Sequence, residues 1–180
     1  MLYELNETLG LGVHLIETPG RPFPASRPME KFGPRQKIHQ EILNNARPGD
    51  VVAVARLYFD RTETPNAKEE LKFWIEQVSN LAERLKKRDL KLVIMGPGPI
   101  FEFEDIRECD LNTADSCSIS RSNMVTQVNS IIDQLTLLTR EHKNVFVFDT
   151  FSKLCPAEID RCQSHKQGTF MYRDKDHLNV

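Results

Sequence analysis

Hydrophobic residues recur every three or four positions in three segments of the chain, and this spacing predicts three helices. The helices cover about residues 35–47, 66–85 and 122–138. The middle segment is the most regular, and its apolar stripe consists of Leu71, Trp74, Ile75, Val78, Leu81, Ala82 and Leu85. A single stripe of this kind packs against a core. Ser122 is the expected N-cap of the third helix.

Short apolar runs predict the strands, at residues 11–16, 51–58, 90–95 and 145–148. The run from Val51 to Tyr58 is rich in valine, which is typical of a parallel strand covered on both faces. Because strands and helices alternate along the chain, we expect a three-layer α/β/α sandwich with a parallel sheet and right-handed crossovers.

The N-terminal part of the chain fits this pattern less clearly. Residues 1–9 are interpreted as the end of a helix, because three leucines recur there at near-helical spacing. Residues 18–28 are rich in glycine and proline, which excludes a helix or an interior strand. We therefore expect residues 18–28 to cross the surface of the protein.

The carboxyl ends of the strands are the expected position of a ligand site in a sheet of this type. The segments predicted to meet there are residues 56–59, 96–100 and 149–151 and the C-terminal turn. Gly96-Pro-Gly-Pro99 is interpreted as a rigid strand end, because proline has no N–H group with which to bind a phosphate. Arg56 interrupts an apolar strand near this rim, so it either pairs with a buried carboxylate or faces the pocket.

Composition indicates an ordinary globular domain. The 180 residues are 39% hydrophobic and 28% charged, with a net charge of -2. This charge gives no electrostatic case for a nucleic-acid partner. No apolar run approaches the roughly 20 residues that span a bilayer. The acidic N-terminus does not resemble a signal peptide.

The four cysteines form two local pairs, Cys109 with Cys117 and Cys155 with Cys162. Their spacings match no common zinc module, so we expect no metal site. Two disulfides, each closing a loop, would indicate an oxidising compartment. Buried free thiols in a cytosolic protein remain the alternative.

The C-terminal stretch contains the most suggestive spacing, with Asp174 three residues before His177. On a turn, this spacing lets the carboxylate reach the nearer ring nitrogen and leaves the farther nitrogen free as a general base. Charged surface runs are common, so a solvated charged loop is the alternative interpretation. The expected position at the carboxyl rim of the sheet favours the functional interpretation.

The block Tyr172-x-Asp174-x-x-His177-Leu178-Asn179 resembles the last sequence block of SGNH hydrolases and transferases. The resemblance is closest to the extracytoplasmic SGNH domains attached to membrane acyltransferases of the acyltransferase-3 type. Other segments agree in order and spacing, namely Asp50–Arg56, Leu92–Pro97, Phe148-Asp149, Leu154-Cys-Pro156 and Cys162. The similarity extends over most of the chain, which is expected to be one SGNH-like, flavodoxin-like domain, but only the terminal block is specific.

The resemblance implies a serine esterase or acyltransferase that acts on O-acyl groups, such as acetyl, of a cell-envelope polysaccharide. His177 would be the general base and Asp174 its orienting carboxylate, with Arg56 and Tyr58 as candidates for substrate binding. No cofactor is expected. The implied partners are a carbohydrate acceptor and a membrane acyltransferase domain in the same or a partner chain. The implied location is the periplasmic side of the inner membrane.

The sequence departs from the family at the nucleophile. No Gly-Asp-Ser occurs, since Gly49-Asp50 is followed by Val51, and the family's Gly-x-Asn-Asp block is also absent. We therefore expect the 1–180 domain to be incomplete, with the first strand, its serine and the closing helix outside it. These 180 residues alone are expected to be inactive, because a base without its nucleophile forms no acyl-enzyme.

Loss of the first strand would also leave unpaired backbone groups and an uncovered apolar surface. A non-catalytic glycan-binding or assembly module with a decayed site is the alternative function. A cytosolic α/β protein with an accidental Asp-x-x-His is a further alternative.

Overall fold

The structure is a computed structural model that describes residues 10, 12–16, 22–25, 33–59, 68–110, 113 and 116–177. Its helices are α2 (Gly33–Asn45), α3 (Lys68–Lys86), the 3₁₀ helix η1 (Ile106–Glu108), α4 (Arg121–Glu141) and α5 (Thr150–Leu154). Its strands are β1 (Val51–Val54), β2 (Lys91–Met95), β3 (Ser118–Ser120), β4 (Val145–Phe148), β5 (Arg161–Gln163), β6 (His165–Lys166) and β7 (Thr169–Phe170). The predicted helix at residues 1–9 and the family-block residues Leu178 and Asn179 lie outside this description.

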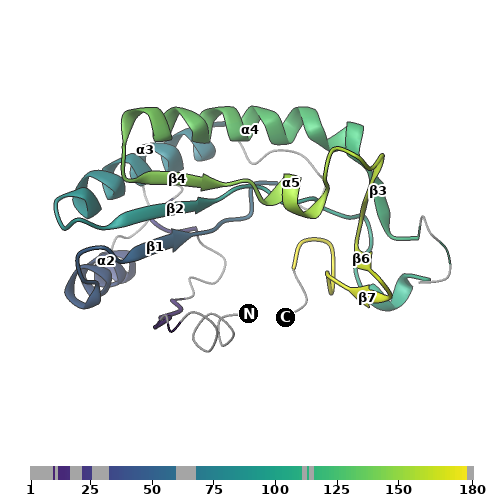
Figure 1. Ribbon diagram of the computed structural model, residues 1–180, viewed down its shortest axis with the longest axis horizontal. Helices are drawn as coiled ribbons and strands as arrows, with labels where there is room; N and C mark the ends of the chain where they lie inside the picture. Colours follow the sequence, from purple (N-terminus) through teal and green to yellow (C-terminus); the bar gives the residue numbers. More distant parts are fainter. Residues whose placement is uncertain are drawn as a thin grey trace.

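A parallel sheet in the order β1-β2-β4 forms the centre of the fold, as Figure 1 shows. Val54 of β1 is in register with Ile94 of β2, and Leu92 of β2 with Val145 of β4. The predicted α/β fold with a parallel sheet is therefore confirmed. Within the described residues, β1 and β4 are the two edges of this sheet.

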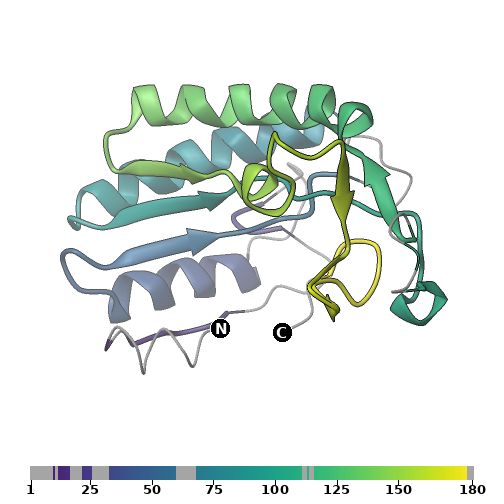
Figure 2. The same cartoon turned by 45° about the vertical axis from the view of Figure 1, so that its right-hand side comes forward.

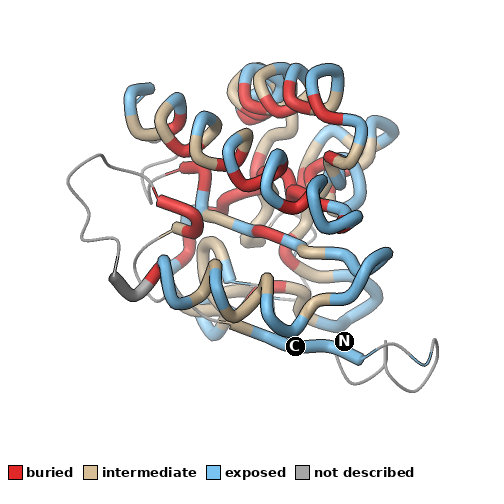
Figure 3. Tube along the Cα trace, turned by 90° about the vertical axis from the view of Figure 1, so that its left-hand side faces the viewer, coloured by how far each residue is buried: buried red, intermediate tan, exposed pale blue. Residues whose placement is uncertain are grey.

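Helices cover one face of the sheet. α3 contacts β2, and α4 contacts both β4 and α3. α2 lies beside α3, where Nη1 of Arg84 is 3.4 Å from Nδ1 of His39. In Figure 2 the strands lie in front of α3, and in Figure 3 the buried positions gather between the helices and the sheet.

Buried and exposed side chains alternate along the strands, so the sheet has one face covered by helices and one open face. Leu92 and Ile94 point to the helices and are fully buried. On the opposite face Val51 is 56% exposed, Phe146 48% and Phe148 42%. A parallel strand normally has both faces covered, and the described part of the chain places no helix over this second face. We call the residues Val51, Ala53, Val93, Met95, Phe146 and Phe148 the open face.

Several predictions about local structure need correction. Residues 12–16 form no strand, Val13 and Leu15 are exposed, and none of the described strands pairs with this segment. The first sheet strand ends at Val54, because residues 55–58 leave the ladder to line the rim. The N-cap of α4 is Ser120 rather than Ser122.

The proline-rich loop also does more than cross the surface. Phe23 and Ala25 are buried, and Nε1 of Trp74 donates a 2.8 Å hydrogen bond to the carbonyl of Phe23. A buried indole N–H needs an acceptor, so Phe23 satisfies the buried side chain of Trp74 on α3.

Beyond the rim, two disulfides hold a smaller region of short strands. Cys109 is bonded to Cys117 and Cys155 to Cys162, as predicted, and none of the four cysteines is free. β3 and β5 pair antiparallel, with Ile119 opposite Cys162. The sequence did not predict β3, β5, β6 or β7, because two- and three-residue strands carry too little periodicity.

Candidate active site

The C-terminal turn is attached to the rim of the sheet by backbone hydrogen bonds. The N–H of Phe101 donates to the carbonyl of Lys175, and the N–H of Ile106 donates to that of Arg173, both at 3.0 Å. A third bond, from the N–H of Arg173 to the carbonyl of His177, closes the turn on itself. The turn is therefore held beside the segment that follows β2, where the sequence placed it.

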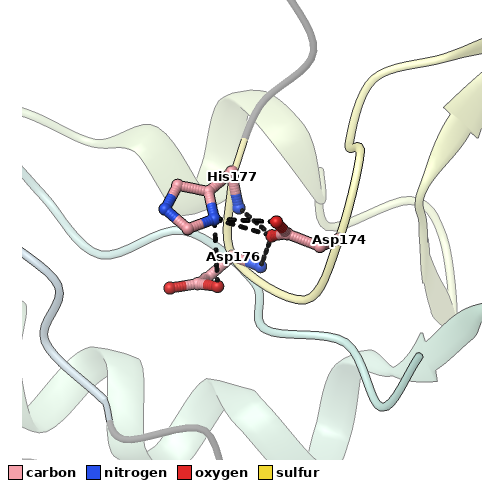
Figure 4. Close-up of side chains that lie close together, drawn as sticks. All are labelled: Asp174, Asp176 and His177. Atoms are coloured by element: carbon pink, nitrogen blue, oxygen red, sulfur yellow. Dashed lines mark hydrogen bonds and ion pairs between the residues drawn. The ribbon is translucent and has the colours of Figure 1, made fainter. Parts of the chain in front are cut away.

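His177 and Asp174 make the contact that their spacing predicted. Nδ1 of His177 lies 2.8 Å from Oδ1 and 2.9 Å from Oδ2 of Asp174. With the Nδ1 proton held by the carboxylate, Nε2 has a free lone pair and can accept a proton. Figure 4 shows Nε2 on the side of the ring away from Asp174. The side chain of His177 is 46% exposed, so the ring is open to solvent.

Hydrogen bonds keep Asp174 ionised. Burial by itself raises the pKa of Asp174, but the N–H groups of His177 and Asp176 and the imidazole donate to the carboxylate, and together they lower its pKa. The backbone bonds are 3.0 Å from His177 and 3.2 Å from Asp176. A carboxylate fixed in this way orients an imidazole and stabilises the imidazolium that forms on proton transfer.

A second carboxylate lies against the same ring. Oδ1 of Asp176 is 3.5 Å from Nδ1 of His177, and the Asp176 side chain is only 6% exposed. In Figure 4 its carboxylate extends beneath the imidazole, with the second oxygen on the side of Nε2. The sequence analysis did not single out Asp176, because nothing in a run of charged residues shows which side chain turns inward.

The three side chains could also be considered as a metal site, since their ligand atoms lie within 4.8 Å of one another. Nδ1 of His177 is the ring nitrogen beside both carboxylates, and to join them around an ion it would have to give up its proton and its bond to Asp174. The remaining ligands would be two carboxylates of one short turn. The donor set therefore fits a hydrogen-bonded histidine–carboxylate pair better than a metal centre.

A cavity of about 230 Å³ opens beside the turn, at the carboxyl ends of the sheet strands. Its wall comes from residues 55–59 after β1, residues 96–100 after β2, and Thr150 and Leu154 of α5. Tyr172 and Asp176 of the C-terminal turn complete it. The segment Gly96–Pro99, interpreted from the sequence as a rigid strand end, is therefore part of the cavity wall.

Arg56 and Tyr58 both line this cavity. Nε of Arg56 donates to the carbonyl of Leu57 at 3.2 Å, whereas its Nη1 is buried without a hydrogen-bond partner among the described residues. The guanidinium of Arg56 lies over the rings of Trp74 and Tyr58, at 5.1 and 5.7 Å from their centroids. Burial lowers the pKa of Arg56, while Tyr58 and Glu70 oppose this shift. The hydroxyl of Tyr58 donates to the carbonyl of Met95 at 2.9 Å. Arg56 thus lies in the cavity wall, which was one of the two alternatives, whereas its stacking on two aromatic rings was not predicted.

A serine–histidine–carboxylate cluster lies elsewhere, between α3 and α4. Nε2 of His142 is 2.8 Å from Oγ of Ser79, and its Nδ1 is 2.9 Å from Oε1 of Glu83. Ser79 is inside a helix, where backbone N–H groups are used by the helix itself and none is left to stabilise an oxyanion. This cluster therefore joins two helices, and its residues do not form a hydrolytic site.

The fold and the turn together define an α/β protein with a histidine–aspartate pair at the carboxyl rim of a parallel sheet, the arrangement of a hydrolase or group-transfer module. The chain matches the family model described as "SGNH domain (fused to AT3 domains)" over residues 1–180, and it belongs to that family. Comparisons with curated proteins and with solved structures found no match.

Family membership confirms the resemblance and describes the chain as an SGNH hydrolase or acyltransferase module of a kind fused to membrane acyltransferase domains. The two disulfides agree with an extracytoplasmic location. None of the described helices is long and apolar enough to cross a membrane.

Proposed function

We propose that the domain transfers or hydrolyses O-acyl groups, such as acetyl, on a cell-envelope polysaccharide through a serine acyl-enzyme. The observation that carries this proposal is the bidentate contact of Asp174 with Nδ1 of His177, which leaves Nε2 free at the rim. Asp174 would orient the ring, and Arg56 and Tyr58 would shape the adjacent substrate cavity.

The chemistry needs a serine, which we propose lies on a segment outside these 180 residues. Two features support such a segment. β1 has a partner on one side only within the described residues, and the open face leaves large apolar side chains in water. A further parallel strand beside β1 would satisfy its edge, and its carboxyl end would reach the rim that carries His177.

The proposed reaction has two steps. The serine oxygen attacks the acyl carbon while its proton passes to Nε2 of His177, and the donor oxygen leaves with that proton. An acceptor hydroxyl or water then gives a proton to Nε2 and attacks the acyl-enzyme, and the serine oxygen takes the proton back. Asp174 remains ionised throughout and stabilises the imidazolium.

Attachment to a membrane acyltransferase domain, on the periplasmic side of the inner membrane, is part of the same proposal. It is supported by the family's fusion to AT3 domains and by the two disulfides. Such a partner would deliver the acyl group, and a carbohydrate would accept it. The proposed module uses no cofactor and no nucleic-acid partner.

The test is to express the protein from its longer coding sequence and to measure cleavage of an activated acetyl ester and labelling by a fluorophosphonate. We expect both activities, and we expect His177→Ala to abolish ester cleavage. His14→Ala is a suitable control because His14 is exposed and distant in sequence from the turn. Full activity of His177→Ala would refute the role of His177 as the base.

A non-catalytic glycan-binding module is the second candidate, favoured by the absence of Gly-Asp-Ser from the 180 residues. The longer coding sequence separates the two candidates. An upstream Gly-Asp-Ser together with fluorophosphonate labelling supports the enzyme, whereas a longer protein that lacks both supports the binding module.

A further inference from the structure

We propose that the end of the sheet opposite the rim docks on a bilayer of anionic lipids, so that the rim with His177 points away from the membrane. This end consists of three segments that lead into β1, β2 and β4, namely residues 47–50, 86–91 and 140–143, and we call it the basic end. The inference rests on the proposed attachment to a membrane domain, and it adds which face of the module meets the lipid.

The basic end concentrates positive charge that the overall charge of the chain does not reveal. Its three segments contain seven of the 24 lysines and arginines of the chain, but only three of its 26 aspartates and glutamates. A net charge of -2 for the whole chain therefore coexists with a local excess of four positive charges. The seven cations are Arg47, Lys86, Lys87, Arg88, Lys91, Arg140 and Lys143.

These cations are free to meet an external anion. All seven residues are exposed, and none of their side chains has an ion pair or a hydrogen bond among the described residues. Cations near the rim are different, since Lys175 is paired with Glu104 and Arg107 with Asp105. The positive charge of the basic end is therefore not neutralised by the described part of the chain.

Backbone hydrogen bonds hold the three segments side by side. The N–H of Gly49 donates to the carbonyl of Asp89 at 2.7 Å. The N–H of Leu92 donates to the carbonyl of Asn144 at 2.8 Å. In Figure 1 the basic end lies on the left, and the strand arrows point away from it toward the rim. The charges thus project from one fixed end of the sheet.

The rim end carries the opposite charge. Residues 102–110 contain five acidic residues and one arginine. β2 between the two ends is five residues long, so at about 3.3 Å per residue roughly 16 Å separate them. This distance exceeds the Debye length of about 8 Å at physiological salt, so the acidic end does not cancel the attraction of the basic end. An anionic surface attracts one end and repels the other, and this polarity orients the module.

The composition of the basic end favours a lipid surface over another polyanion. Four of its seven cations are lysines, which are point charges on flexible stems and impose no fixed geometry on a partner. The three segments contain no aromatic residue, whereas single-stranded nucleic acids are bound by stacking on aromatic rings. Leu137 precedes Arg140 by three residues on α4 and is 52% exposed, so it offers an apolar side chain to the headgroup region.

Attachment makes a modest affinity sufficient. Clusters of about four to eight lysines and arginines beside a membrane bind anionic lipids, and the family of this chain is fused to membrane domains. A short flexible linker gives an effective concentration in about the millimolar range, so a weak affinity of the free domain would keep the attached domain docked. The docked orientation turns the rim toward the aqueous space, where the proposed acceptor lies.

The experiment is cosedimentation of this 180-residue chain with vesicles of phosphatidylcholine, either pure or with about a quarter of phosphatidylglycerol. We expect binding only to the vesicles that contain phosphatidylglycerol. Binding should weaken at least about tenfold between roughly 0.01 M and 0.15 M salt, because the Debye length falls from about 30 Å to about 8 Å. Adsorption through the apolar open face is distinguishable, since it would occur on pure phosphatidylcholine and resist salt.

Two matched variants test the position of the charge. The basic-end variant carries Lys86→Gln, Lys87→Gln, Arg88→Gln and Lys91→Gln, and it should weaken vesicle binding by more than about tenfold. The control variant neutralises four other exposed lysines through Lys68→Gln, Lys72→Gln, Lys153→Gln and Lys166→Gln. Both variants change the net charge equally, so a difference between them reports where the charge lies. Unchanged thermal melting shows that each variant is folded.

The orientation has its own measurement. Vesicles with a spin-labelled headgroup lipid broaden the NMR signals of amides that approach the bilayer surface. We expect broadening of the amides in the three segments of the basic end, while those of residues 102–110 should stay sharp. The opposite pattern would place the rim against the membrane and overturn the inference.

Three further outcomes overturn it. The first is no binding to phosphatidylglycerol vesicles at low salt, and the second is an equal effect of the two variants on binding. The third is tighter binding to a soluble polyanion, polygalacturonate, than to the vesicles at equal concentrations of charge. That result would assign the basic end to an anionic polymer in solution.

The vesicle measurements do not depend on catalysis, so they are separate from the proposed function. Vesicle binding by a longer protein that cleaves no ester would retain the docking surface and reject the enzyme. Ester cleavage without vesicle binding would do the reverse. In the longer protein the basic-end variant should still cleave the ester, because none of its four substituted residues lines the rim cavity.

Discussion

Asp174 contacts His177 at two points, through the imidazole Nδ1 at 2.8 Å and through the backbone N–H at 3.0 Å. The carboxylate therefore fixes both the ring and the chain that carries it. A histidine held only by its own side chain would lose more conformational entropy whenever it adopted the reactive orientation. Here the turn has already restricted that freedom before a substrate binds.

The first prediction concerns this pair in the longer protein that carries the proposed serine. Asp174→Asn should lower kcat for cleavage of an activated acetyl ester by orders of magnitude, toward the roughly 10⁴-fold effect of such a change in serine hydrolase triads. The physical reason is that an amide can donate to Nδ1 and so favour the wrong tautomer. Steady-state kinetics with a circular dichroism check of folding would measure this effect.

Asp176→Asn provides the comparison for that prediction. Its carboxylate is 3.5 Å from Nδ1, beyond a good hydrogen bond, so its loss should affect kcat less than the loss of Asp174. A larger kcat effect at Asp176 than at Asp174 would contradict the assignment of Asp174 as the orienting residue.

The second prediction concerns His39, on the surface of α2 that meets α3. Burial, with a smaller effect of the Arg84 charge, lowers the pKa of His39 from 6.5 to about 4. The folded protein thus keeps the imidazole neutral, whereas the unfolded chain binds a proton below pH 6.5. The stability from this group is present above pH 6.5 and is lost as the pH falls toward 4.

His39→Gln should therefore reduce the loss of stability between pH 6.5 and pH 4, measured as the shift in the urea midpoint. Arg84→Gln should give an intermediate result, because it removes the charge but keeps the burial. An unchanged pH dependence in His39→Gln would show that other groups dominate acid unfolding in this range.

Much of this architecture could be predicted from the sequence because it depends on long, regular signals. The hydrophobic stripe that contains Trp74 predicted α3. The apolar run at residues 145–148 predicted β4 with its observed bounds. Asp174 and His177 could be paired because their contact is local, across three residues of one turn. Contacts of this kind depend little on the rest of the fold.

The features that escaped prediction depend on distant parts of the chain. Asp176 turns inward because the terminal turn is fastened to Phe101 and Ile106, about seventy residues earlier. Arg56 stacks on Trp74 because two elements happen to meet there. Spacing along the chain carries no information about either contact. The sequence therefore predicted which segments meet at the rim, but the contacts of Asp176 and Arg56 there emerged only from the structure.

The third prediction compares the two disulfides. They close loops of similar length, with sequence separations of 8 and 7, so chain entropy assigns each about 2.5 kcal/mol. Cys155 and Cys162 are also fully buried, whereas Cys109 and Cys117 are half-buried. Replacing Cys155 and Cys162 with alanine should therefore lower the melting temperature more than replacing Cys109 and Cys117, because it also leaves cavities.

Thermal denaturation of the two double-alanine variants measures this difference, and reduction of the parent protein sets the upper limit of the effect. Equal melting temperatures for the two variants would show that loop closure alone accounts for the stabilisation. Thiol counting on natively expressed protein complements the comparison, since four free thiols would contradict an extracytoplasmic location.

The fourth prediction concerns the open face, where Phe146 and Phe148 are 48% and 42% exposed. Exposed apolar patches bind hydrophobic dyes and promote association. In the 180-residue chain, Phe146→Thr with Phe148→Thr should lower dye fluorescence and self-association severalfold while changing the melting temperature little, because threonine retains β propensity. Phe151→Thr is the contrasting variant, because Phe151 is 2% exposed and its truncation should cost about 3 kcal/mol.

The same double substitution should behave differently in the longer protein. If an additional segment covers the open face there, Phe146 and Phe148 become core residues, and the substitution should lower the melting temperature markedly and leave dye binding low in both parent and variant. Dye fluorescence and calorimetry on the two lengths of protein, each with and without the substitution, give the comparison. Equal dye binding by the two parent proteins would show that the face stays open, and it would remove one of the two structural supports for a segment that brings the serine to His177.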